Sequence, residues 1–154
     1  MIPYIVVDAS IAGAWLFSEQ FTSEAKPVLE ALVAQRVIGL APDRFEEELL
    51  RICQKKTLPP PEGAGLSPDQ CFDRFQDLMT SPIPFYLLPS QELHEQAWEM
   101  ATTIPKLTTH DALYLALAKR WSAELWTADS DLAGQDVRTV YGKIYDIRSE
   151  PFSH

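Results

Sequence analysis

Two aspartates stand where a parallel α/β protein places its ligand-binding residues. Asp8 directly follows the apolar run at residues 4–7, and Asp129 follows a second short apolar run at residues 125–127. Ligands of open parallel sheets bind beyond the carboxyl ends of the strands, so acids at these positions are candidates for chemistry. The alternative for Asp8 is a helix N-cap, although Ser10 is also suited to that role. The alternative for Asp129 is a capped turn of helix.

Two further acids lie on predicted helices. Glu48 follows Phe45 by three residues and precedes Ile52 by four, so it shares the apolar face of its helix. A carboxylate on that face needs a partner, unless it reaches solvent at the edge of the stripe or forms a buried ion pair. Asp111 follows Thr108 by three residues, which suits a helix cap. The same position also places Asp111 at the helix end that faces the strand tips.

Four carboxylates at one edge of a sheet would repel one another without a positive ion, and oxygen ligands favour hard cations such as Mg²⁺ or Mn²⁺. A divalent cation there can polarise a phosphodiester and lower the pKa of a bound water. The sequence contains no glycine-rich phosphate-binding motif, and no Ser, Cys or His triad has comparable support. The pattern therefore predicts a metal-dependent nuclease whose ligands are Asp8, Glu48, Asp111 and Asp129.

Apolar runs that alternate with helical patterns must position these acids. Short β-branched or aromatic runs predict strands at residues 4–7, 37–40, 85–88 and 125–127, with a fifth at residues 137–140. Apolar residues at helical spacing predict helices at residues 10–17, 22–36, 44–55, 67–79, 90–100 and from 108 onward. Because the connections are helical, the strands should be parallel. The predicted fold is an α/β protein, a three-layer α/β/α sandwich with a parallel sheet of four to five strands flanked by helices.

Local motifs refine the predicted helix starts. Asp43 and Glu46, three residues apart, predict a capping box before the helix that carries Glu48. Ser67 followed by Pro68 predicts a second helix start. Between these two helices, residues 57–65 contain three consecutive prolines and are therefore predicted to form an exposed loop.

Length and charge limit the possible functions. With 154 residues the chain is expected to form one domain, residues 1–154, whose core needs no disulfide or structural metal. The formal charge of −9 argues against a general attraction to nucleic acid or to a membrane. RNA would have to follow a local basic strip, for which ordinary solvated surface is the alternative. The candidates for that strip are Arg51, Lys55, Lys56, Lys119 and Arg120.

The remaining special residues predict core positions. Cys53 and Cys71 have no zinc or redox spacing, so we interpret them as reduced, buried thiols. Trp98, Trp121 and Trp126 are interpreted as core aromatics rather than base-stacking platforms. No apolar run approaches the ~18 residues of a membrane span, and no leader pattern is present, so we expect a cytoplasmic protein.

Four motifs in this order resemble the PIN-domain nucleases, and among them the VapC-like toxins of bacterial type II toxin–antitoxin systems. The motifs lie at residues 6–12, 41–49, 110–118 and 125–132. The resemblance implies a PIN-like fold in which the four acids named above hold the metal. It aligns the family's helical glutamate to Glu48, although the neighbouring Glu46 and Glu47 leave that register open. It also implies that Asp131 assists a second metal site.

The resemblance further implies a Mg²⁺- or Mn²⁺-dependent endoribonuclease that hydrolyses RNA phosphodiester bonds. It implies a homodimer held inactive by a cognate antitoxin protein, a segment of which fills the groove near the metal. Two other interpretations stay open. One is a PIN-like module that binds RNA or protein with weak or no catalysis. The other is a phosphotransfer protein that accepts phosphate at Asp8, which is disfavoured because no acidic residue directly precedes Asp8.

Overall fold

The computed structural model describes residues 1–154. The protein is built around a single parallel sheet. Its five strands have the order β3-β2-β1-β4-β5, and every neighbouring pair is parallel. The strands are β1 (Tyr4–Val7), β2 (Ile38–Pro42), β3 (Phe85–Leu88), β4 (Glu124–Thr127) and β5 (Ile144–Asp146). The predicted α/β class and the parallel five-stranded sheet are thereby confirmed.

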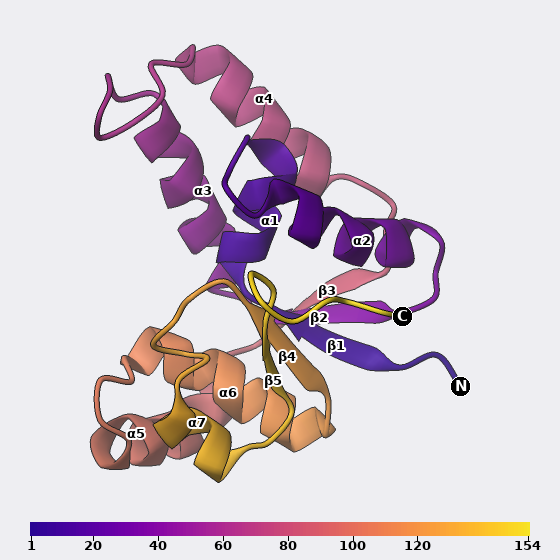
Figure 1. Ribbon diagram of the computed structural model, residues 1–154, viewed down its shortest axis with the longest axis vertical. Helices are drawn as coiled ribbons and strands as arrows, with labels where there is room; N and C mark the ends of the chain where they lie inside the picture. The colour runs from indigo at the N-terminus through magenta and orange to yellow at the C-terminus, as the bar shows by residue number, and fades with distance from the viewer.

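Helices lie on both faces of this sheet, as Figure 1 shows. α1 and α2 lie on one face, and α5, α6 and α7 lie on the other, while α3 and α4 form an upright pair that projects beyond the sheet. The helices are α1 (Ala9–Leu16), α2 (Thr22–Val33), α3 (Phe45–Lys56), α4 (Pro68–Met79), α5 (His94–Thr103), α6 (Thr109–Trp121) and α7 (Gln135–Val140), with a 3₁₀ turn at Gln91–Leu93. No helix combines the length and apolarity that crossing a bilayer requires.

The central strand β1 contributes to two cores. Ile5 and Val7 pack with residues of α1 and α2, whereas Val6 packs with residues of α6 on the opposite face. Successive side chains of a strand point to opposite faces, so a continuous apolar run fits a strand covered on both sides. α6 contributes seven consecutive buried residues, from 112 to 118. Together these contacts hold the β1 and α6 ends that carry Asp8 and Asp111.

The prediction of a strand at residues 137–140 is wrong. These residues belong to α7, and the fifth strand lies further on, at Ile144–Asp146. The two valines of α7 are three residues apart, which is a helical spacing, and only Val137 is buried whereas Val140 is 40% exposed. Ile144 is fully buried beside Leu125 of β4, so it occupies the position that the sequence pattern assigned to the valines.

The predicted capping box of α3 is also wrong. The helix begins at Phe45 with Arg44 as N-cap residue, and no side chain caps it. Because β2 continues to Pro42 beside Leu88, the backbone N–H of Asp43 donates to the Leu88 carbonyl at 2.9 Å. The Asp43 carboxylate instead accepts a hydrogen bond from Ser90. Asp43 therefore ties the start of α3 to the end of β3 rather than capping the helix.

Candidate active site

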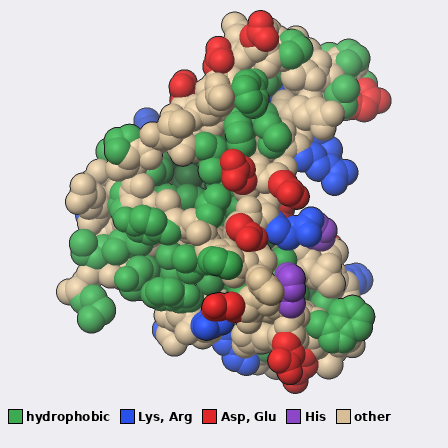
Figure 2. Space-filling model, turned by 180° about the vertical axis from the view of Figure 1, so that it is seen from behind, with side chains coloured by type: hydrophobic (Ala, Val, Ile, Leu, Met, Phe, Trp, Pro, Cys, Tyr) green, Lys and Arg blue, Asp and Glu red, His purple; other side chains and the backbone are tan.

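Four of the five predicted acids line one cavity of about 470 Å³ at the carboxyl ends of β1 and β4. Figure 2 shows Asp and Glu side chains gathered at the hollow on the right of that view, with Lys, Arg and His side chains beside them. The cavity is lined by Asp8, Ala9, Ser10, Glu48, Arg51, Ile52, Lys55, Asp111 and Asp129. Asp131 is exposed and is not part of this lining.

Hydroxyl groups hold Asp8 in place on the strand side of the cavity. Asp8 is 6% exposed, and its Oδ2 accepts hydrogen bonds from Thr127 Oγ1 at 2.8 Å and Ser10 Oγ at 2.9 Å. Asp8 is the N-cap residue of α1, as the alternative for this position predicts, but its carboxylate makes no capping hydrogen bond to the helix. Burial raises the pKa of Asp8 above its ordinary value, against the lowering effect of these two hydrogen bonds.

Thr127 connects Asp8 to the turn that carries Asp129. Its side-chain oxygen accepts a hydrogen bond from the Asp129 backbone N–H at 2.9 Å, while its hydroxyl donates to Asp8. Thr127 is fully buried at the end of β4, in the strand next to β1. Sequence reasoning placed Thr127 in a strand but did not assign it a role. The available signal was a polar residue that ends a buried strand directly before a candidate acid.

The Asp129 side chain takes part in a local turn as well as facing the cavity. Its Oδ1 accepts a hydrogen bond from the Asp131 backbone N–H at 2.8 Å. The turn predicted as an alternative for Asp129 is therefore present, and it leaves the residue on the cavity wall.

The helix side of the cavity lacks comparable hydrogen bonds. Oε1 of Glu48 and the hydroxyl of Tyr114 are both buried, and neither has a hydrogen-bond partner. Burial, followed by the charges of Asp8 and Asp111, raises the pKa of Glu48 to about 7, although the charge of Arg44 lowers it somewhat. No ion pair neutralises Glu48. An unpartnered buried carboxylate oxygen is a position at which a cation or a proton could bind.

Asp111 stands at the first turn of α6 and has a similar environment. Its backbone N–H donates to Thr108 Oγ1 at 3.2 Å, which confirms the predicted cap by Thr108. Burial, followed by the charges of Asp129 and Asp8, raises the pKa of the Asp111 side chain to about 7. The same residue thus belongs to a helix start and to the acidic cavity.

The donor set of this cavity fits a divalent cation. All four acids offer carboxylate oxygens, the ligands that Mg²⁺ and Mn²⁺ prefer, and one of those oxygens is buried without a partner. No three His, Cys, Asp or Glu side chains are arranged closely enough to hold an ion as they stand. The acids therefore surround a cavity rather than forming a closed coordination shell. A cation entering it would relieve the repulsion that raises their pKa values.

Two predicted basic residues lie at the same cavity. Arg51 and Lys55, four residues apart on α3, line it together with the acids. The other three candidates lie apart from it, since none lines the cavity. Lys56 forms an ion pair with Glu19 at 2.5 Å, and Arg120 forms one with Glu92 at 3.2 Å.

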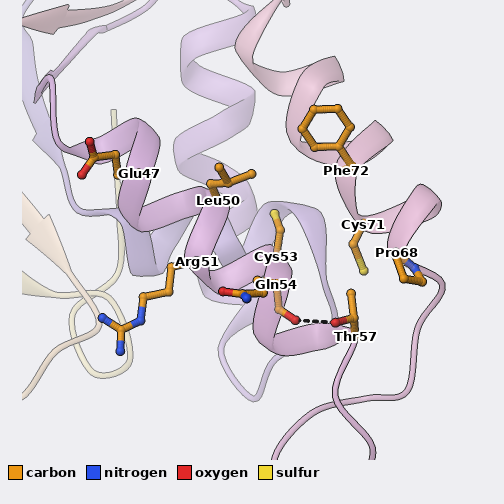
Figure 3. Close-up of a pocket in the computed structure, with 9 residues that line it drawn as sticks. All are labelled: Glu47, Leu50, Arg51, Cys53, Gln54, Thr57, Pro68, Cys71 and Phe72. Carbon is orange, nitrogen blue, oxygen red and sulfur yellow. Dashed lines mark hydrogen bonds between the residues drawn. The ribbon is translucent and has the colours of Figure 1, made fainter.

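A larger, more apolar groove of about 610 Å³ separates α3 from α4. Figure 3 shows the thiols of Cys53 and Cys71 between the two helices, with Phe72 on α4 and with Arg51 leaving α3 on the side away from α4. Both cysteines are free and buried, as predicted. Leu50 and Phe72 are 41% and 48% exposed. The groove and the acidic cavity share only Arg51, so α3 has an acidic wall and an apolar one.

The prediction that all three tryptophans belong to the core is wrong for Trp98, which is 66% exposed on α5. Trp126 is buried and stacks on Tyr145 with ring centroids 4.8 Å apart, as predicted. The prediction is also wrong for Trp121, which is 42% exposed, although its ring packs against that of Tyr4 with ring centroids 4.9 Å apart.

Comparisons with known proteins agree with this fold. The sequence profile of the PIN domain family matches residues 5–137. One similar solved structure is that of VapC20 from Mycobacterium tuberculosis, a toxin that cleaves the sarcin–ricin loop. It has a TM-score of 0.64 and 14% sequence identity, and the match covers 84% of this chain and 92% of that one.

The structure of FitAcB from Neisseria gonorrhoeae is also similar, with a TM-score of 0.62 and 16% identity, and the match covers 95% of this chain and 99% of that one. At these identities the likeness establishes the fold. No curated protein sequence matches the chain significantly.

Proposed function

This chain belongs to the PIN domain family, and from that premise we propose that it is a divalent-metal-dependent endoribonuclease, the toxin of a toxin–antitoxin pair. The observation that carries the proposal is the cavity whose wall combines four carboxylates with an unpartnered Glu48 oxygen. The four motifs that resemble PIN-domain nucleases supply these four acids, and the family match confirms that resemblance.

Each acid has a distinct part in the proposed mechanism. Asp8, Glu48, Asp111 and Asp129 would hold Mg²⁺ or Mn²⁺, and Asp131 would assist a second ion from the exposed end of the turn after β4. The bound cation would polarise the phosphodiester and lower the pKa of the attacking water. Thr127 and Ser10 orient the Asp8 carboxylate by donating to Oδ2. No side-chain nucleophile is required.

Arg51 and Lys55 contribute to substrate binding in this proposal. Both lie on the wall of the acidic cavity, where their charges can contact the phosphates on either side of the cleaved bond. Local cations at the site compensate for the overall charge of −9, which does not favour RNA at a distance. RNA cleavage is also the reason to expect the protein in the cytoplasm.

The test is cleavage of a structured RNA pool by the purified protein with Mg²⁺, Mn²⁺ or EDTA. Glu48→Gln should strongly reduce metal-dependent cleavage, whereas Glu46→Gln, which changes an exposed acid on the same helix, should leave it unchanged. This pair also tests Glu48 against Glu46 as the metal ligand of α3. Full activity of Glu48→Gln would remove that residue from the site, and activity that persists in EDTA would contradict the metal requirement.

The proposed partners are a second copy of the chain and an antitoxin. The α3–α4 groove offers the antitoxin an exposed apolar surface, Leu50 and Phe72, directly beside the active-site helix. Phe72→Glu should weaken inhibition by the antitoxin and leave RNA cleavage intact. Light scattering during size-exclusion chromatography tests the homodimer, and a monomeric mass at micromolar concentration would contradict it.

The second candidate function is a binding module with weak or no catalysis, and the same groove favours it. Specific binding of RNA or of a protein partner without any metal-dependent turnover would support this candidate over the nuclease.

A further inference from the structure

A second hollow, of about 310 Å³, lies where α5 and α6 meet the start of α3. Trp98 on its wall is the most exposed aromatic side chain of the protein, at 66%. An indole ring left largely in water contributes little to the core and is available for contact with a ligand. The hollow is lined by Arg44, His94, Ala97, Trp98, Thr109 and Leu113.

This hollow adjoins the acidic cavity through two helix starts. Arg44 is the N-cap residue of α3, and its carbonyl accepts the backbone N–H of Glu48 at 3.0 Å, so the two residues are one turn apart. Thr109 begins α6 two residues before Asp111. A polymer bound along the acidic cavity would therefore reach the hollow within a short distance.

The lining chemistry fits a nucleotide better than a peptide. An exposed indole offers a flat surface on which a base can stack, and such stacking contributes about 1–3 kcal/mol per base. Arg44 makes no ion pair with an acidic side chain, so its guanidinium is available to a phosphate. A hollow of this size is at the lower end of small-ligand sites and suits one base. An apolar protein segment would find a better surface in the α3–α4 groove.

We propose that this hollow is a nucleobase subsite of the active site. Trp98 stacks on one unpaired base of the RNA close to the cleaved bond, and Arg44 binds the phosphate that connects this base to the acidic cavity. The base must be unpaired because a stacked duplex hides its faces. The subsite would favour loops and single strands over duplex RNA. This inference rests on the proposed ribonuclease function.

Steady-state cleavage of a short single-stranded RNA in Mg²⁺ tests the subsite. Trp98→Ala should raise KM by about 5–150-fold, the equivalent of one stacked base, while kcat changes little. Trp98→Phe should restore most of the loss because it keeps an aromatic face. The matched control is Phe72→Ala, which removes an exposed aromatic side chain from the other groove and should leave KM unchanged.

Binding by the Asp8→Asn protein, measured by fluorescence anisotropy, separates this inference from the proposed function. The Kd for single-stranded RNA should be higher in the double variant Asp8→Asn, Trp98→Ala than in Asp8→Asn alone, and the Kd for duplex RNA should be the same in both. This result supports the subsite even if the wild-type protein cleaves nothing. Cleavage by the wild-type protein with KM unchanged in Trp98→Ala overturns the subsite alone. A raised KM in Phe72→Ala but not in Trp98→Ala assigns the RNA to the α3–α4 groove. If the protein neither binds nor cleaves any RNA, and Trp98 is needed only to bind a protein partner, both the subsite and the ribonuclease function are overturned.

Discussion

The two walls of the acidic cavity are built differently. On the strand wall, the Asp8 carboxylate accepts two hydroxyl hydrogen bonds, and Thr127 links it to the Asp129 backbone. On the helix wall, Glu48 Oε1 and the Tyr114 hydroxyl are buried without hydrogen bonds. Both walls carry carboxylates with raised pKa values. Only the strand wall, however, is oriented by neutral donors before any ion binds.

This difference indicates a division of work. The strand wall is preorganised, because fixed hydroxyl groups set the direction of Asp8 whatever the ion content. On the helix wall, burial and the charges of neighbouring acids disfavour the ionised carboxylates, and only protons or a cation relieve this cost. Removing a carboxylate from either wall should therefore reduce catalysis, and changes to the helix wall should in addition alter the response to pH and metal.

The largest effect is expected from Asp8→Asn. The substitution keeps the size of the side chain but removes the charge at the centre of the preorganised wall, so cleavage should fall by about 10³-fold or more. Initial rates on a defined RNA in Mg²⁺ measure the loss, with circular dichroism as the check that the fold is retained. Cleavage within a few-fold of the wild-type rate would exclude Asp8 from the mechanism.

Thr127→Val tests whether the strand wall matters by orienting Asp8. The variant removes one donor to Asp8 and the acceptor of the Asp129 N–H, so kcat should fall by about 10–100-fold, as for other groups that orient metal ligands. Thr127→Ser keeps the hydroxyl and should recover most of the activity. If valine and serine variants are equally impaired, the effect comes from packing in the buried strand end rather than from the hydrogen bonds.

The helix wall should make the stability of the metal-free protein depend on pH. Glu48 and Asp111 have pKa values of about 7 in the folded protein, above their ordinary values of 4.5 and 3.8. The folded state therefore holds more protons than the unfolded state between these values, and stability falls as the pH rises toward about 7.

Thermal unfolding in EDTA should accordingly show Tm several degrees lower at about pH 8 than at about pH 5. Added Mg²⁺ should raise Tm more at the higher pH, because ionised carboxylates bind it best. Glu48→Gln should flatten the dependence, and Glu46→Gln should not. If Glu48→Gln keeps the full wild-type dependence of Tm on pH, the pH effect originates elsewhere.

Tyr114→Phe should have the smallest effect. It removes a buried hydroxyl that has no hydrogen-bond partner, so metal-free stability should stay the same or rise by about 1 kcal/mol. Urea unfolding in EDTA measures this change. A loss of stability greater than about 1 kcal/mol would mean that the hydroxyl is bonded in solution, and the helix wall would then be less strained than described.

The sequence indicated much of the fold because its strongest patterns are local. Four strands and the helix that carries Glu48 are recognised from apolar periodicity, which reflects burial on one or two faces. The fifth strand could not be located, since its place is set by pairing with β4 and not by the residues of α7. The start of α3 was misjudged because the length of β2 depends on its pairing with β3.

The sequence by itself determined which acids are available and the order of the motifs that contain them. Only the tertiary structure decided that Asp8, Glu48, Asp111 and Asp129 line one cavity, that Thr127 holds the first of them, and that Trp98 faces solvent. The physical reason is that residue type and spacing report local burial. Hydrogen bonds and charge interactions between segments more than a hundred residues apart depend on how the sheet brings their ends together.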